Sequence, residues 1–200
     1  MTNKPNIAIL ISGSGSNLQA IIDAAKADTL FANLALLISN QADAYGLRRA
    51  QQADIATQII SHNDFASRDA FDLALHAALT EANIDYVILA GFMRLLTPWF
   101  IDQWPDKLVN IHPSLLPAFK GTHAIEQAFE AGVKITGCSV HFVRPDMDSG
   151  PIIAQSAIDI KEDDNLTTLT ERMHTAEHAL YPMVINWLVS GRITVVDERV

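Results

Sequence analysis

Short apolar runs alternate with stretches of helical spacing through the first half of the chain. The runs have the length of buried β-strands and predict strands at residues 7–11, 33–39, 56–60 and 86–90. The stretches between them repeat apolar residues every three or four positions and predict helices at about 18–25, 43–54 and 63–79. We expect Asn63 or Asp64 to cap the third helix. Strands alternating with helices are typical of a doubly wound α/β fold, with a mostly parallel sheet and helices on both faces.

The second half of the chain has a less regular pattern. Residues 91–106 predict an aromatic turn and a short helix. From Asn165 the apolar residues keep helical spacing for over 20 residues, although Pro182 should kink or interrupt this helix. The other predicted elements are strands at 107–112, 134–143 and 152–158, a helix at 124–131, and an edge strand or tail at 192–196. Because no repeat or linker is present, we expect one domain spanning residues 1–200.

Composition and charge narrow the class of protein. The chain has 200 residues, of which 49% are hydrophobic, enough for a substantial core. A net charge of -9 and a pI near 5.1 argue against binding to nucleic acids or membranes, because these negatively charged partners bind basic protein surfaces. Cys138 is the only cysteine, which excludes an internal disulfide and fits a reducing compartment. With no signal-peptide pattern and no apolar membrane span, we expect a cytoplasmic protein.

A glycine-rich loop joins the first predicted strand to the first helix. Its sequence is Gly13-Ser14-Gly15-Ser16-Asn17, and backbone amides at a helix N-terminus favour an anion such as phosphate. The loop lacks the Gly-Lys-Ser/Thr of an ATP-binding Walker loop, and Leu18 stands where a dinucleotide-binding motif has its third glycine. A phosphomonoester ligand therefore fits better than ATP or NAD, while a tight turn without any ligand remains the alternative.

Asn110, His112 and Asp148 form the candidate catalytic group. Within the segment LVNIH, the alternation of a strand places Asn110 and His112 on the same face, and Pro113 favours a strand end at His112. Asp148 follows in the Gly/Pro-rich loop RPDMDSGP. An amide N–H and an imidazolium can both donate to an oxyanion, and a nearby carboxylate favours the charged imidazole. The group therefore suits acyl transfer to an amine, although a lone strand histidine is more often structural.

Other candidate residues favour an apolar wall for a ligand and do not favour a metal site. The segment AGFMRLL, residues 90–96, follows a buried strand, and it fits either the wall of a heterocycle pocket or a helix start packed on the sheet. The seven histidines give no support for a metal site, and we expect none. We interpret His141 and His178 as structural, or as supports for neighbouring site residues.

Five segments together resemble one enzyme family. These are LISGSGSNLQAIIDA, AGFMRLL, NIHPSLLPAFKG, SVHFV and MDSGPIIAQ, and they closely resemble the folate-dependent phosphoribosylglycinamide formyltransferases of purine biosynthesis. The resemblance runs in register from about residue 6 to residue 187. It implies a Rossmann-like formyltransferase fold, with a phosphate-binding N-terminal half and a folate-binding, catalytic C-terminal half. It also hints at a cis Leu116–Pro117 bond, which the local sequence leaves open.

The resemblance also assigns roles to residues. It implies that His112 donates a proton, with Asp148 favouring its charged form and Asn110 at the reactive end of the folate. The residues implied to bind the phosphate and ribose of the first substrate are Gly15, Ser16, Asn17 and Glu177. Those implied to bind 10-formyltetrahydrofolate are Arg68, Met93, Arg94, Leu95, Leu96, Asn110, Val143 and Arg144. In AFKG, Lys120 stands where some members have a proline before the glycine, and Ile125 stands where a histidine is common. Both departures lie near the loop at Thr122 and His123.

The implied reaction is direct formyl transfer from 10-formyltetrahydrofolate to the amine of phosphoribosylglycinamide, without a metal, by a monomer or a homodimer. Among related enzymes, a methionyl-tRNA formyltransferase would carry a tRNA-binding domain, and a formyltetrahydrofolate hydrolase would carry a regulatory domain and need no phosphate loop. A phosphosugar-binding regulatory module is the alternative from a different class. That module would keep residues 13–17 but leave the Asn, His and Asp group unexplained.

Overall fold

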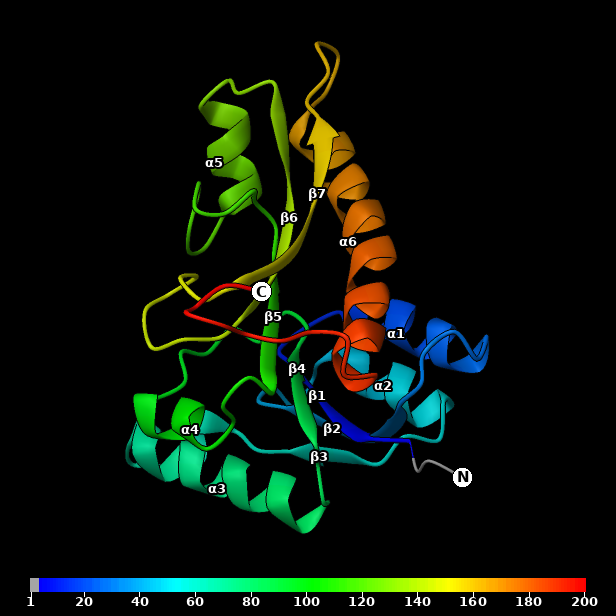
Figure 1. The fold of residues 1–200 in the computed structure, drawn as a ribbon, viewed down its shortest axis with the longest axis vertical. Coiled ribbons are helices and arrows are strands. Elements are labelled where there is room, and N and C mark those ends of the chain that lie inside the picture. The colour runs from blue at the N-terminus through cyan, green and yellow to red at the C-terminus, as the bar shows by residue number, and fades with distance from the viewer. Residues whose placement is uncertain (1–3) are drawn as a thin grey trace.

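The computed structural model describes residues 4–200, which form one seven-stranded sheet in the order β3-β2-β1-β4-β5-β6-β7 (Figure 1). The strands are β1 (Asn6–Ile11), β2 (Asn33–Ser39), β3 (Thr57–Ile59), β4 (Tyr86–Leu89), β5 (Leu108–His112), β6 (Ile135–Phe142) and β7 (Ile152–Asp159). The first five strands are parallel, whereas β6 and β7 are antiparallel to their neighbours. The doubly wound, mostly parallel sheet is therefore confirmed.

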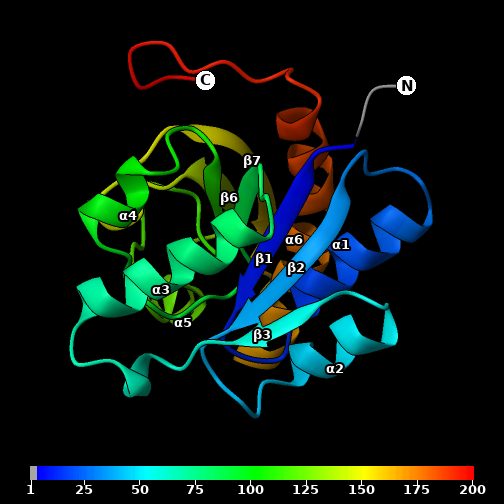
Figure 2. The same cartoon turned by 90° about the horizontal axis from the view of Figure 1, so that it is seen from below.

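Helices cover both faces of the sheet, as expected. The helices are α1 (Ser16–Lys26), α2 (Tyr45–Gln52), the 3-10 turn η1 (His62–Asp64), α3 (Arg68–Glu81), α4 (Pro98–Asp102), α5 (Ala124–Glu130) and α6 (Leu166–Val189). One apolar core lies between the sheet and α1, α2 and α6, and a second lies between the sheet and α3 and α4 (Figure 2). The central strands read as continuous apolar runs because both of their faces are buried.

Two helix predictions need correction. Ser67, not Asn63 or Asp64, caps α3, and its hydroxyl accepts a hydrogen bond from the Ala70 amide at 3.2 Å. Residues 62–64 instead form the separate turn η1. Pro182 does not interrupt α6, which continues to Val189. The missing proline N–H costs the helix one hydrogen bond, but the buried side chains around Pro182 keep both halves packed on the sheet.

The strand order creates a switch point beside β1. Chain connections run outward in one direction from β1 to β2 and β3, and in the other direction from β4 to β5, so the loops leaving β1 and β4 diverge. The two loops are joined where they start, because the Ser12 amide donates to the Gly91 carbonyl at 3.1 Å. Ligands of open α/β sheets bind at such a point, beyond the carboxyl ends of the strands.

Two further features complete the fold. The Leu116–Pro117 peptide bond is cis. After α6, residues 190–200 form a tail, as one of the two expected alternatives, with an isolated bridge between Val196 and Arg199. Within residues 4–200, we find no helix with the length and apolar character needed to cross a membrane.

Candidate active site

A cavity of about 850 Å³ opens at the carboxyl ends of β1, β4 and β5. Its size falls within the range of small-molecule sites. Three regions predicted from the sequence line it: the glycine loop at 13–17, the segment at 90–96, and the Asn110, His112 and Asp148 group. The cavity also brings together residues from the loops at 121–126 and 143–148 and from α6.

The glycine loop is held in place by α2. Gly15 has a left-handed φ of 70° at the start of α1, and a Cβ at this position would lie 2.8 Å from the Cα of Gly46. The Gly46 amide donates to the Gly13 carbonyl at 3.1 Å, and Arg49 Nε donates to the Ser14 carbonyl at 2.9 Å. These contacts fix the loop, so that the first amides of α1 lie at the cavity with the positive end of the helix dipole.

Asn17 and Glu177 form a buried polar pair at this end of the cavity. Asn17 Nδ2 donates to Glu177 Oε2 at 3.1 Å, and the two residues are 9% and 5% exposed. Burial raises the pKa of Glu177 to about 7, although the hydrogen bond from Asn17 opposes this effect. Asn17 Oδ1 is buried and has no hydrogen-bond partner within residues 4–200. A carboxyl group near its pKa beside an unpaired acceptor suits a ligand that carries hydroxyl groups.

His174 lines the same end of the cavity, and the sequence interpretation missed it. It lies three residues before Glu177 on α6, so helical spacing places the two side chains on one face. This spacing is visible in the sequence and could have identified His174 as a site residue once Glu177 was chosen.

Asp148 connects two histidines at the centre of the cavity. Its Oδ2 lies 3.4 Å from Nδ1 of His112, and its Oδ1 lies 3.6 Å from Nε2 of His141. The Gly121 amide also donates to Oδ2 at 2.8 Å. Burial raises the pKa of Asp148, but His141, the Gly121 amide and His112 outweigh burial, so its pKa lies below the usual range. Asp148 is therefore a carboxylate at neutral pH.

Both ring nitrogens of His112 face acceptor oxygens. Nε2 lies 2.8 Å from the carbonyl oxygen of Phe119, on the side of the ring opposite Asp148. A carbonyl can only accept, so Nε2 carries a proton. A proton on Nδ1 as well would satisfy Asp148, and the doubly protonated imidazolium is the form that satisfies both neighbours.

Asn110 reaches this group through His141. The two residues are register partners on β5 and β6, and Asn110 Nδ2 lies 3.3 Å from His141 Nε2. His141 Nδ1 lies 2.9 Å from the Phe142 carbonyl oxygen, and its Nε2 faces both Asn110 and Asp148. An amide nitrogen carries two hydrogens, so Asn110 keeps one for a ligand. His141 therefore has a supporting place in the site.

The segment at 90–96 forms an apolar wall. Met93 and Leu95 are 71% and 58% exposed, which is unusual for large apolar side chains beside a cavity without a ligand role. The Met93 amide donates to Ser12 Oγ at 2.8 Å, which ties the wall to the glycine loop. Leu96 also lines the cavity but is buried.

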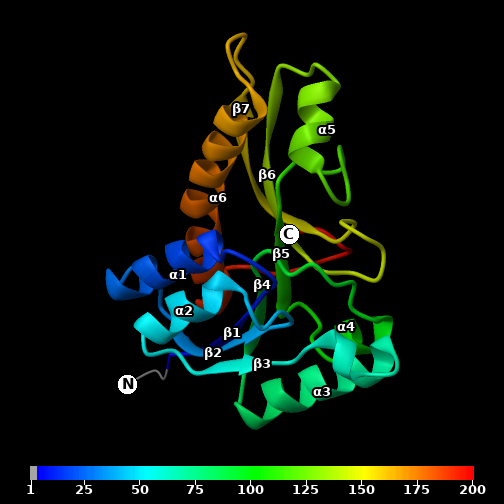
Figure 3. The same ribbon diagram turned by 180° about the vertical axis from the view of Figure 1, so that it is seen from behind.

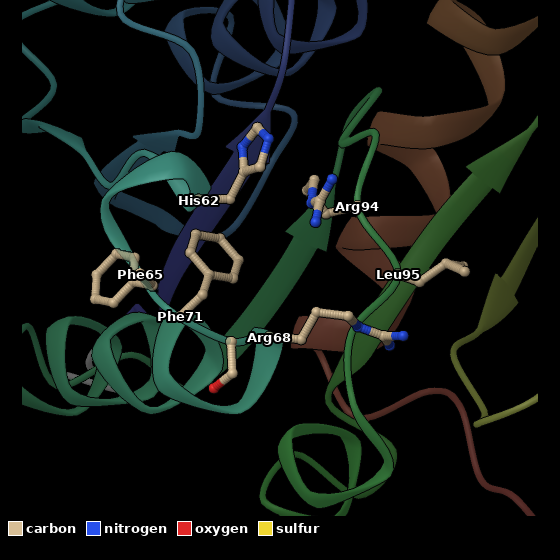
Figure 4. Close-up of a pocket in the computed structure, with 7 residues that line it drawn as sticks. His62, Phe65, Arg68, Phe71, Arg94 and Leu95 are labelled. Atoms are coloured by element: carbon tan, nitrogen blue, oxygen red, sulfur yellow. The ribbon is translucent and has the colours of Figure 1, made fainter.

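Arg68 does not line this cavity. It lies in a neighbouring pocket of about 160 Å³ that shares Arg94 and Leu95 with the main cavity. In this pocket Arg68 extends from α3 toward the segment that carries Leu95 (Figure 4), and its Nη2 donates to the Leu96 carbonyl at 3.4 Å. Arg68 is therefore placed at the outer edge of the apolar wall.

Val143 and Arg144 line the main cavity at the start of the loop that carries Asp148. The Arg144 guanidinium is already paired with Asp106 and Glu198, at 2.8 Å from each. Within residues 4–200, no group of three or more His, Cys, Asp or Glu side chains has the arrangement of a metal site.

Known proteins resemble this chain along nearly its whole length. The model of the formyl transferase family matches residues 5–185. A phosphoribosylglycinamide formyltransferase of Escherichia coli is 47% identical over 188 residues, which cover 94% of this chain and 89% of the relative. A trifunctional purine biosynthetic protein of Gallus gallus is 46% identical over 97% of this chain, but the chain spans only 19% of that longer relative.

Solved structures agree with these relatives. A glycinamide ribonucleotide transformylase 1 from Symbiobacterium toebii has a TM-score of 0.97 and 43% identity, covering 100% of this chain and 94% of the other. The family model, the sequence relatives and the solved structures all match this fold and span the cavity residues. The chain therefore belongs to the formyl transferase family.

Proposed function

We propose that the protein transfers the formyl group of 10-formyltetrahydrofolate to the amine of 5'-phosphoribosylglycinamide, in purine biosynthesis. The products are the N-formyl compound and tetrahydrofolate. The observation that carries the proposal is that one cavity holds Asn110, His112 and Asp148 between a glycine loop and an exposed apolar wall. The similarity to named phosphoribosylglycinamide formyltransferases supports the same substrates.

The phosphoribosyl end is proposed to lie at the glycine loop. Gly15, Ser16 and Asn17 would hold the phosphate with backbone amides at the N-terminus of α1. Glu177 would contact the ribose, since a carboxyl group with a pKa of about 7 can accept from or donate to hydroxyl groups.

The folate is proposed to lie on the apolar wall. Met93, Leu95 and Leu96 would pack on its flat ring, and the backbone of the same segment would read the ring edge. The other proposed folate contacts are Arg68, Arg94, Asn110, Val143 and Arg144. A ring on this wall explains why two large apolar side chains are left exposed beside the cavity.

The chemical step is proposed to be direct. The substrate amine attacks the formyl carbon, and a C–N bond forms while the carbonyl oxygen becomes an oxyanion. The free N–H of Asn110 and a proton of His112 stabilise that oxygen. The bond from the formyl carbon to N10 of the folate then breaks as the oxyanion becomes a carbonyl again. N10 gains a proton supplied by His112, and the proton lost by the attacking amine returns to His112, directly or through water. Asp148 stabilises the charged imidazole during these steps.

The present contact of His112 sets one requirement for this step. Nε2 donates to the Phe119 carbonyl, so His112 must exchange this carbonyl for the reacting oxygen, directly or through water. Holding both substrates in one cavity would contribute several of the roughly 7 to 11 kcal/mol that well-oriented reactants can gain.

The wider proposal concerns the whole chain. Residues 1–200 would act as one formyltransferase domain, with the phosphate bound mainly by its N-terminal half and the chemistry carried by its C-terminal half. It would use two small-molecule substrates and no metal ion, in the cytoplasm, as a monomer or a homodimer.

The test measures tetrahydrofolate formation with and without phosphoribosylglycinamide. Formation only when the amine is present supports transfer, whereas formation without the amine means hydrolysis and contradicts the proposal. Asn110→Ala, His112→Ala and Asp148→Asn should each lower kcat by roughly 100- to 1000-fold. Asp163→Asn, a charge removal at an exposed site, is the matched control and should retain full activity. Near-normal kcat in any two of the three variants would refute the assignment.

A further inference from the structure

The loop at residues 143–150, here named the Asp148 loop, is fixed mainly at its two ends. At its base the Phe142 amide donates to the Pro151 carbonyl at 2.9 Å, and the Val143 amide donates to the Leu108 carbonyl at 2.9 Å. At its far end Asp148 accepts from the Gly121 amide at 2.8 Å. Between these ends residues 145–147 are exposed, and Asp148 itself is held over the cavity by the Gly121 amide, His112 and His141.

Arg144 makes three hydrogen bonds to segments outside the Asp148 loop. Its guanidinium binds Glu198 with two hydrogen bonds, Nε to Oε2 at 2.8 Å and Nη2 to Oε1 at 3.2 Å. Nη2 also donates to Asp106 Oδ1 at 2.8 Å. A forked pair of this kind fixes direction as well as distance. Arg144 therefore ties the loop to two segments that lie outside the cavity.

Glu198 reaches Arg144 from the segment that follows α6. Figures 1 and 3 both show this segment crossing from the end of α6 to the loop between β6 and β7. Val196 and Arg199 close a tight turn with two backbone hydrogen bonds, of 2.8 and 3.0 Å. The turn residues, Asp197 and Glu198, have left-handed φ angles of 48° and 55°.

This backbone conformation is costly for glutamate. Left-handed φ angles are uncommon outside glycine, asparagine and aspartate, and such strain persists where neighbouring contacts compensate for it. The conformation of Glu198 presents its carboxylate to Arg144, and the forked ion pair is the contact that compensates.

We propose that Glu198 is a positioning residue for formyl transfer, which holds the Asp148 loop over the cavity by binding Arg144. The proposal rests on the proposed function, because the loop carries Asp148 and covers the folate side of the cavity. In this arrangement the Arg144 guanidinium anchors the loop to Glu198 and Asp106, and the backbone of Arg144 is left as its proposed folate contact. A larger fraction of the free protein then has the loop closed when the folate binds.

The size of the effect follows from the exposure of the pair. Arg144 is 22% exposed and Glu198 is 67% exposed, so solvent screens their attraction. Loss of such a pair should reduce the ratio of closed to open loop by about two- to fivefold. The KM for 10-formyltetrahydrofolate should rise by up to the same factor, because only the closed loop completes its site. kcat should stay nearly constant, because bound folate keeps the loop closed.

The experiment compares Glu198→Gln with Asp197→Asn. The control removes the same charge from the neighbouring turn residue, whose carboxylate has no ion pair within residues 4–200, and asparagine tolerates the left-handed backbone. Glu198→Gln should raise the KM for the folate by up to about fivefold, with the KM for phosphoribosylglycinamide and the Tm unchanged. Asp197→Asn should change none of these.

Hydrogen exchange at the Gly121 amide gives a second readout that needs no substrate. This amide is protected by Asp148, so its exchange should accelerate in Glu198→Gln and not in Asp197→Asn. Arg144→Met should accelerate the exchange at least as much, because it also loses the contact with Asp106, and adding Glu198→Gln to Arg144→Met should have no further effect.

Equal behaviour of Glu198→Gln and Asp197→Asn would overturn the proposal, as would a further effect of Glu198→Gln in the Arg144→Met background. A rise in both KM values together with a lower Tm would also overturn it, because that result means general destabilisation. If the unaltered protein transferred no formyl group, the proposed function would fail by itself. Exchange at Gly121 would then still decide whether Glu198 holds the loop.

Discussion

Replacing Glu177 by glutamine should stabilise the folded protein at neutral and alkaline pH. Burial raises the pKa of Glu177 from 4.5 in a free chain to about 7, with the Asn17 hydrogen bond acting in the opposite direction. The folded protein therefore binds this proton more tightly than the unfolded chain does. The free energy of unfolding is least affected below pH 4.5, decreases as the pH rises toward 7, and levels off above that.

The magnitude follows from the size of the pKa difference. Each unit corresponds to about 1.4 kcal/mol, so ionised Glu177 should cost the folded protein about 3 kcal/mol above neutral pH. Glutamine has almost the same shape and no charge, and it adds an N–H donor beside Asn17 Oδ1, which lacks a partner within residues 4–200. We therefore expect Glu177→Gln to be more stable than the unaltered protein by about 3 kcal/mol near pH 8, and by less than about 1 kcal/mol near pH 5.

The assay is urea denaturation, followed by tryptophan fluorescence, at several pH values between about 5 and about 8. Glu171→Gln is the matched control, since Glu171 lies on the same helix but is exposed. The same pH dependence in both variants would refute the reasoning about burial. Glu177→Gln should also raise the KM for phosphoribosylglycinamide, because the charge that costs stability is proposed to bind the ribose.

Two other predictions concern the glycine loop and the cysteine. Gly15→Ala should lower stability by about 1 to 3 kcal/mol and raise the KM for phosphoribosylglycinamide, because its Cβ would meet Gly46 Cα at 2.8 Å and its φ is left-handed. Gly13→Ala, whose Cβ meets nothing within 4 Å, is the control, and equal effects would contradict the prediction. Burial, followed by the charge of Glu177, raises the pKa of Cys138 to about 12, so thiol reagents near pH 8 should label it only after unfolding. Rapid labelling of the folded protein would contradict this expectation.

The sheet could be predicted because its signal is local. Continuous apolar runs identify buried strands wherever they occur, and β2 matches the predicted residues 33–39. The start of α3 could not be predicted in this way. Asn63, Asp64 and Ser67 are all suitable caps, and the choice among them depends on which side chain meets an amide at the helix start, as Ser67 Oγ does with the Ala70 amide.

The candidate site likewise has a part that local sequence predicts and a part that depends on contacts between distant residues. Strand alternation predicted that Asn110 and His112 share a face, and both line the cavity. The contact of Asn110 with His141 depends on the antiparallel register of β5 and β6, which alternation within one strand does not contain. The partners of Arg144 lie 38 and 54 residues away, and no local pattern connects them. Their roles in catalysis and binding stay predictions.

The position of β5 bears on how this protein could change during evolution. β5 is the strand where the parallel part of the sheet meets the antiparallel part, and it carries Asn110 and His112. Backbone hydrogen bonds hold it on both edges, so an insertion within it would turn both side chains away from the cavity. The loops at residues 113–123, after β5, and at 143–151, after β6, lie outside the strands of the sheet. New substrate preferences could therefore arise by changes in these loops while the two donors keep their positions.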